Sequence, residues 1–83
     1  MSLLDREHAR KRLQIMEEAW DDVLSLRIPL PKSRSQKDLW TRLMRTHIRH
    51  TCSLRELEVF PKGPWEYVKE VVDNGVFMER GRA

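Results

Sequence analysis

Residues 53–83, SLRELEVFPKGPWEYVKEVVDNGVFMERGRA, decide the fold that we expect for this chain. Ser53 and Glu56 have the spacing of a capping box, which favours a helix start before LRELEVF. The PKGP segment then interrupts the chain, and Pro64 is well placed as the first residue of another helix through WEYVKEVVDN. Gly75 stops that helix, and VFMERGR follows as a short strand or an extended tail.

Two further helices are expected before this stretch. The first lies within residues 1–26, where apolar side chains recur at steps of four, three, four and three residues and form one seam: Ala9, Leu13, Met16, Trp20 and Val23. Two prolines within three residues then make residues 27–35 an extended connector. The second helix should begin after Ser35, whose hydroxyl caps it with Asp38 three residues on, and it runs through QKDLWTRLMRTHIRH.

These elements predict a mainly α fold, a small helical domain of about four helices with a short C-terminal strand or tail. The chain has 83 residues, which is room for one domain with a small core. We therefore expect a single domain over residues 1–83. Its parts are the N-terminal amphipathic helix of residues 1–26, the connector of residues 27–35 and a compact part formed by residues 36–83.

The order of elements from about Lys37 to Arg82 resembles winged-helix and helix-turn-helix domains. The segment YVKEVVDNGVFMERGR is similar to the recognition helix and first wing strand of bacterial and archaeal regulators. The resemblance implies that the helix over residues 65–74 enters the major groove of DNA. Its outward positions here are mostly acidic, which disfavours phosphate contacts. They are Glu66, Glu70 and Asp73, with Lys69 as the one base.

The basic residues are concentrated in the middle of the chain. Residues 27–52 hold seven basic residues and one acidic residue, whereas the segments on either side each carry a small acidic excess. On the second predicted helix, Arg42, Arg45 and Arg49 fall within an arc of about 60° at 100° per residue. Guanidinium groups on one face suit phosphate contacts, although a solvated helix face explains the same pattern. The predicted nucleic-acid contacts are Lys37, Arg42, Arg45, Arg49, Arg80 and Arg82.

The charges of the first predicted helix are divided between its two halves. The N-terminal half is basic and the C-terminal half is acidic, the reverse of what the helix dipole favours. An antiparallel second copy would place each basic half beside an acidic half. The seam therefore predicts a homodimer interface made by Ala9, Leu13, Met16, Trp20 and Val23. In the alternative interpretation, the same seam packs against the other helices of its own chain.

The composition excludes several classes of protein. No segment has the length and apolar character of a membrane span, and the opening residues lack the apolar run of a signal peptide. The single cysteine, Cys52, excludes a disulfide within the chain and agrees with an intracellular location in the cytoplasm, nucleoid or nucleus.

Metal binding and catalysis are not expected. His47, His50, Cys52 and Glu56 lie close together in the sequence, but they lack the two well-spaced ligand pairs of structural zinc sites. His47 lies on the apolar arc and is explained as a half-buried packing residue. The sequence has no glycine-rich phosphate loop and no nucleophile elbow, so we expect a non-enzymatic protein without metal or cofactor.

Two functional interpretations remain open. In the first, the chain is a small nucleic-acid-associated regulator that binds the phosphate backbone through its basic helix with little base readout. In the second, it is a protein-protein interaction module, whose contact surface is the acidic helix with Trp65 or Tyr67. A third interpretation is a piece of a larger protein.

Overall fold

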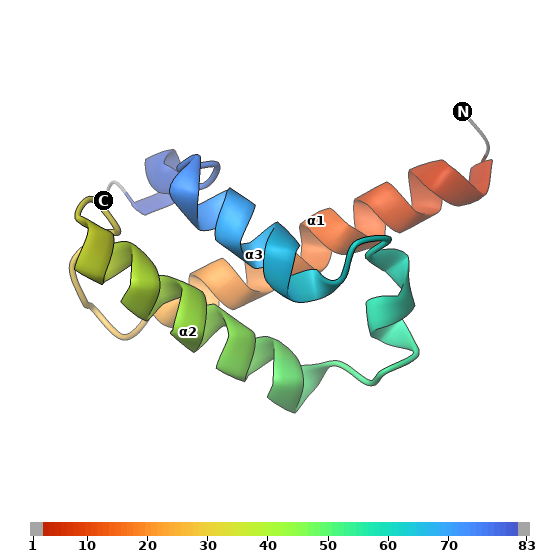
Figure 1. Ribbon diagram of the computed structural model, residues 1–83, viewed down its shortest axis with the longest axis horizontal. Coiled ribbons are helices and arrows are strands. Elements are labelled where there is room, and N and C mark those ends of the chain that lie inside the picture. The colour runs from red at the N-terminus through yellow and green to blue at the C-terminus, as the bar shows by residue number, and fades with distance from the viewer. Residues whose placement is uncertain (1–2, 82–83) are drawn as a thin grey trace.

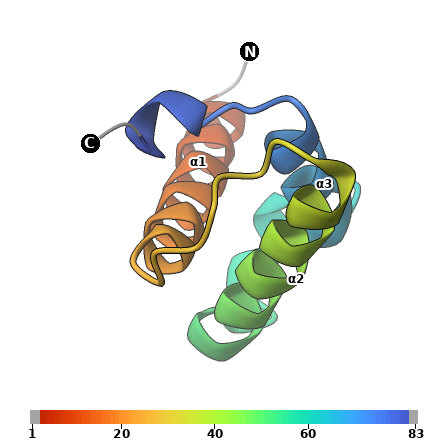
Figure 2. The same cartoon turned by 90° about the vertical axis from the view of Figure 1, so that its left-hand side faces the viewer.

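The computed structural model describes residues 3–81, in which three α-helices run in alternating directions (Figure 1). Helix α2 contacts both α1 and α3, and the connector crosses from the end of α1 to the start of α2 (Figure 2). Two short 3-10 helices complete the chain. The elements are α1 (Leu3–Leu24), α2 (Arg34–Thr51), η1 (Glu56–Val59), α3 (Pro64–Asp73) and η2 (Met78–Gly81).

The contact between Trp20 and Trp40 lies at the centre of the core. Both side chains are fully buried, and their ring centroids are 4.2 Å apart at an interplanar angle of 35°. Phe77 adds a third ring, 5.9 Å from Trp20. The remaining core residues come from α1, α2, α3 and the turn after η1: Ile15, Met16, Ala19, Val23, Met44, Ile48, Phe60, Val68, Val71 and Val72.

The start of α2 differs from the prediction by two residues. Ser33, rather than Ser35, is the N-cap, and its hydroxyl accepts a hydrogen bond from the Gln36 backbone N–H at 3.2 Å. The Ser33 backbone N–H donates in turn to Oε1 of the Gln36 side chain, which completes a capping box. The sequence offered two serines at this point, and Gln36 at the third helical position favours the earlier one.

The helix predicted after Ser53 is much shorter than expected. Ser53 and Glu56 do form the expected reciprocal bonds, at 3.1 and 3.2 Å. They lead into the single 3-10 turn η1 and not into an α-helix. The PKGP segment ends the element after Val59, so the four residues of η1 are too few to continue as an α-helix.

Helix α3 begins and ends as predicted, but the expected strand after it is not formed. Pro64 occupies the first turn, and Gly75 adopts a left-handed φ of +63° just beyond the helix end. Among the described residues there is no strand, and the N–H groups of Val76 and Met78 donate to the carbonyls of Val71 and Gly75 in turns of the same segment. Phe77 turns inward to the core instead, and residues 78–81 form η2.

The apolar seam of α1 is largely covered by the chain itself. Met16, Trp20 and Val23 have no exposed surface, so they leave nothing for a second copy to contact. Of the predicted homodimer interface, only Ala9 and Leu13 lie at the surface. Compared with the predicted seam, the buried face of α1 also includes Ile15 and Ala19 and leaves out Ala9 and Leu13. This helix packs against α2.

Arg12 connects α1 to the turn that precedes α3. It lies one turn before Ile15 on the core-facing side of α1. Its Nη1 donates a hydrogen bond of 2.6 Å to the Val59 carbonyl, 47 residues away in sequence. A bond from a charged donor is stronger than a neutral one, so this contact helps to hold η1 against α1.

The two central tryptophans differ in hydrogen bonding, which gives a matched comparison. Trp40 Nε1 donates a 2.7 Å bond to the Pro29 carbonyl, whereas Trp20 Nε1 is buried without a hydrogen-bond partner among the described residues. We expect Trp40→Phe to lower the free energy of unfolding by about 1 to 3 kcal/mol more than Trp20→Phe does. Urea unfolding of both variants measures this difference. Equal losses would mean that the Trp20 N–H is satisfied in solution.

Glu56 makes part of the stability depend on pH. Hydrogen bonds from Ser53, chiefly from its backbone N–H, and the ammonium of Lys11 at 3.9 Å lower the pKa of Glu56 below its ordinary 4.5. The stabilisation is therefore fully present above pH 4.5 and is lost as the pH falls through the folded-state pKa. The stability difference between wild type and Glu56→Gln should shrink on acidification, measured by urea unfolding. Ser53→Ala should reduce this pH dependence only in part, because the backbone bond remains.

Candidate nucleic-acid interface

Helix α2 places three of its four arginines on the side away from the core. Trp40, Met44 and Ile48 form the buried line of the helix. Arg42 and Arg49 are exposed and Arg45 is half-buried. We call Arg42, Arg45 and Arg49 the arginine face. The sequence predicted that these three residues share one face, and the structure places the apolar residues opposite them.

Trp65 of α3 lies beneath two members of the arginine face. The guanidinium carbons of Arg45 and Arg49 are 5.1 and 5.2 Å from the centroid of the Trp65 ring. Both distances lie within the range of a cation–π interaction, worth about 0.5 to 1 kcal/mol at an exposed site. Trp65 is itself half-buried, with the first turn of α3 fixed by Pro64. Contact with the indole thus restricts the positions of both guanidinium groups, which would move freely on arginine side chains without such a contact.

Within residues 3–81, no ion pair joins the arginine face to an acidic side chain. The described part of the chain contains ion pairs between Lys11 and Glu56 and between His47 and Asp22, and none that includes Arg42, Arg45 or Arg49. The positive charges of Arg42, Arg45 and Arg49 repel one another, and no ion pair of the described residues offsets that repulsion. An anion bound between the guanidinium groups would remove that repulsion. The arrangement is therefore suited to binding phosphate or carboxylate oxygens.

Lys37, another of the predicted contact residues, does not lie on this face. Lys37 is half-buried, and at 100° per residue it lies about 140° around α2 from Arg42 and about 80° from Arg45. The side chain of Arg80 and the whole of Arg82 lie outside the described residues. Among the predicted contacts on α2, the arginine face therefore excludes Lys37, because helical spacing places Lys37 on another side of the helix.

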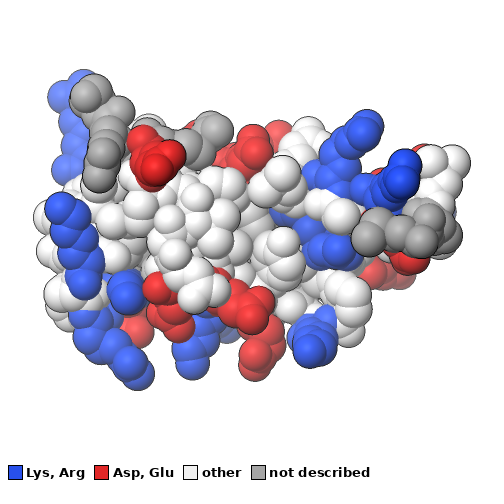
Figure 3. Space-filling view, turned by 90° about the horizontal axis from the view of Figure 1, so that it is seen from above, with Lys and Arg blue, Asp and Glu red and all other residues white. Residues whose placement is uncertain are grey.

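Trp65 was not predicted as a partner of the arginines. The sequence predicted Trp65 or Tyr67 as an exposed contact for a protein partner, and the spacing of Trp65 from α2 carries no information about contact with the arginines. Its companion Tyr67 lies on the opposite flank of α3, against Phe60, with ring centroids 5.4 Å apart. The outer face of α3 between the two flanks is acidic, with Glu66, Glu70 and Asp73 exposed. In the view of Figure 3, basic side chains are most numerous toward the two ends of the molecule.

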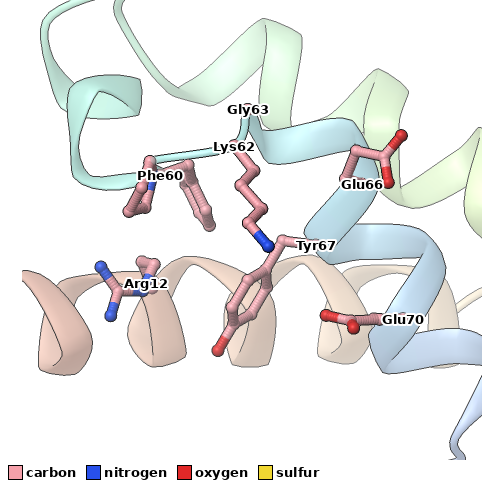
Figure 4. A pocket seen from close by; sticks show the side chains of 8 residues that line it. Arg12, Phe60, Lys62, Gly63, Glu66, Tyr67 and Glu70 are labelled. Atoms are coloured by element: carbon pink, nitrogen blue, oxygen red, sulfur yellow. The ribbon is translucent and has the colours of Figure 1, made fainter.

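A second candidate site lies on the Tyr67 side of α3. It is a cleft of about 330 Å³ between Arg12 of α1, the turn of residues 60–63 and the side chains of Glu66, Tyr67 and Glu70 on α3. Figure 4 shows Arg12 on one side, the two glutamates on the other and Tyr67 between them. This cleft was not predicted from the sequence, because its walls come from three separate segments.

The histidines and the cysteine do not converge on a common point. His47 Nδ1 is 3.1 Å from a carboxylate oxygen of Asp22, so His47 joins α2 to α1. Glu56 is occupied by Ser53 and Lys11. In residues 3–81 there is no group of three or more His, Cys, Asp or Glu side chains that could hold a metal ion. Over the same residues, no helix is long and apolar enough to cross a membrane.

Comparison of the chain with protein-family models, with curated proteins and with solved structures gives no match.

The contact between Trp65 and the arginine face predicts how the fluorescence of the protein responds to anions. Trp20 and Trp40 are fully buried, so collisional quenching reports mainly on half-buried Trp65. We expect iodide to quench the emission more strongly than uncharged acrylamide does, because two guanidinium groups raise the local anion concentration. Arg45→Gln with Arg49→Gln should remove the preference for iodide. A preference that survives the double substitution would show that Arg45 and Arg49 do not create it.

Proposed function

We propose that this chain is a small non-enzymatic regulator that associates with nucleic acid inside the cell and binds the phosphate backbone through its arginine face. The observation that carries the proposal is the pair Arg45 and Arg49, held over Trp65 without an acidic partner among the described residues. Side chains that are already restricted lose less conformational entropy on binding, so each contact contributes more to affinity. Arg42 extends the same surface by one turn of α2.

The proposed binding mode uses phosphates more than bases. Phosphate contacts position a protein on a nucleic acid, whereas contacts to base edges provide sequence specificity. The exposed carboxylates of Glu66, Glu70 and Asp73 on α3 would be repelled from phosphates, which disfavours insertion of α3 into a groove. Helix α2, rather than the helix that corresponds to a winged-helix recognition helix, is thus the proposed contact element. We expect weak dependence on sequence and strong dependence on salt.

The second candidate function is capture of a protein partner by the acidic face of α3. Glu66, Glu70 and Asp73 are exposed on one face of a short helix, next to half-buried Tyr67. A homodimer through the remaining surface residues Ala9 and Leu13 is compatible with either function, as is a role within a larger assembly.

Reversal of the arginine face should weaken nucleic-acid binding and reduce its salt dependence. We expect Arg42→Glu, Arg45→Glu and Arg49→Glu together to make the negative slope of log affinity against log salt shallower by about 2.7 units on duplex DNA, because each lost phosphate contact removes about 0.9 from its magnitude. Affinity should fall to a similar extent for all sequences. Salt-titrated fluorescence anisotropy with duplex DNA and single-stranded RNA measures both effects.

A matched control places the same charge change elsewhere. Arg6, Arg10 and Arg55 are exposed and lie outside α2, so their replacement by Glu alters the net charge equally. This control should retain most of the slope. Glu66→Lys with Glu70→Lys should leave nucleic-acid binding unchanged or strengthen it. Absence of wild-type affinity for either nucleic acid at low salt would refute the proposal, and loss of a protein partner in the Glu66 and Glu70 variant would support the second function.

A further inference from the structure

The cleft on the Tyr67 side of α3 has opposite charges on its two sides. Arg12 stands on the α1 side, and Glu66 and Glu70 stand on the α3 side (Figure 4). Lys62 projects from the turn before α3 toward Tyr67, between the two ends. None of these four charged side chains forms an ion pair within residues 3–81. The cleft is therefore polarised, and its charges remain available to a ligand.

The polarised ends flank an aromatic surface. Phe60 is 5% exposed, and its ring meets that of half-buried Tyr67 edge-on at an interplanar angle of 64°. Aromatic side chains with a few well-placed polar groups are typical of small-ligand sites. The volume of 330 Å³ lies near the lower end of the range for such sites, which sets a limit on ligand size.

The balance of charge selects the class of ligand. Two cationic and two anionic groups line the cleft. An anionic ligand would be repelled by Glu66 and Glu70, and a cationic ligand would be repelled by Arg12 and Lys62. A ligand with one charge of each sign satisfies both ends. Arg12 uses one of its five N–H groups on the Val59 carbonyl, which leaves donors for a carboxylate.

The separation of the two ends favours a peptide over a single amino acid. Arg12 belongs to α1 and the two glutamates belong to α3, and the ring of Tyr67 lies between them (Figure 4). An extended peptide spans about 3.3 to 3.6 Å per residue, so about three residues place its two terminal charges on either side of that ring. In a single amino acid the ammonium and carboxylate are attached to the same carbon, which is too short a span.

We infer that this cleft is a binding site for a short peptide with free termini and an apolar central side chain. The peptide carboxylate lies between Arg12 and Lys62, its ammonium faces Glu70 and Glu66, and its central side chain rests on Tyr67 and Phe60. The site is independent of the arginine face, because it lies on the other flank of α3.

The test uses the intact chain and the tripeptide Gly-Phe-Gly, with its N-acetylated form, its C-amidated form and free phenylalanine for comparison. Amide chemical shifts followed by NMR titration give both the affinity and the location. The unmodified tripeptide should shift the amides of residues 60–70. Blocking either terminus should weaken its binding about tenfold, the effect of one lost charged hydrogen bond. Free phenylalanine should bind more weakly than the tripeptide.

Substitutions assign each end of the peptide. Glu70→Gln should weaken binding of the unmodified tripeptide, and in that variant N-acetylation should have little further effect. Asp73→Asn removes an exposed carboxylate from the same helix outside the cleft and should leave affinity unchanged. Lys62→Gln should likewise weaken binding of the unmodified tripeptide, and in that variant C-amidation should have little further effect. Lys62 is chosen over Arg12 because substitution of Arg12 would also remove its bond to the Val59 carbonyl. Equal affinities for free and blocked tripeptides, shifts confined to the arginine face, or no shifts at millimolar peptide would overturn the inference.

Discussion

The contact between Trp20 and Trp40 is the interaction on which the rest of the structure depends. These two indoles are the largest fully buried side chains, and they come from the two longest helices. Trp40 also bonds to the Pro29 carbonyl, so the same residue fixes the connector. Phe77, in the segment that follows α3, packs its ring against Trp20. A core this small has few other large side chains, so the relative orientation of α1 and α2 follows from how these rings pack.

That orientation determines what each flank of α2 meets. With Trp40 directed toward α1, the flank that carries His47 lies beside Asp22, and the flank that carries Arg45 lies beside α3. The arginine face is therefore partly supported by a neighbouring helix and is more than a solvated stripe of charge. Trp65 supplies the support because it lies on the flank of α3 that faces α2.

Helix α3 has a different chemical character on each side, and both candidate sites depend on this. One flank presents Trp65 to the arginines, the opposite flank presents Tyr67 to the cleft, and the outer surface between them is acidic. The arginine face and the cleft therefore lie on opposite flanks of α3, and Glu66 and Glu70 of the acidic surface form one side of the cleft. The arginine face and the cleft do not share a residue.

The sequence by itself determined the elements that depend on local chemistry. The apolar periodicity of α1 and α2, the reciprocal bonds of Ser53 and Glu56, and the start of α3 at Pro64 were all predicted, because caps and prolines act within a few residues. The shared face of Arg42, Arg45 and Arg49 also follows from helical spacing alone. By contrast, η1 and η2 replaced an expected helix and an expected strand. A strand needs a partner, and the buried position of Phe77 against Trp20 decided that segment instead. Tertiary structure likewise decided that three residues of the α1 seam are core, that Trp65 supports two arginines and that Arg12 reaches Val59. These contacts join residues far apart in the chain, so they depend on how the helices pack and leave no mark in the spacing of the sequence.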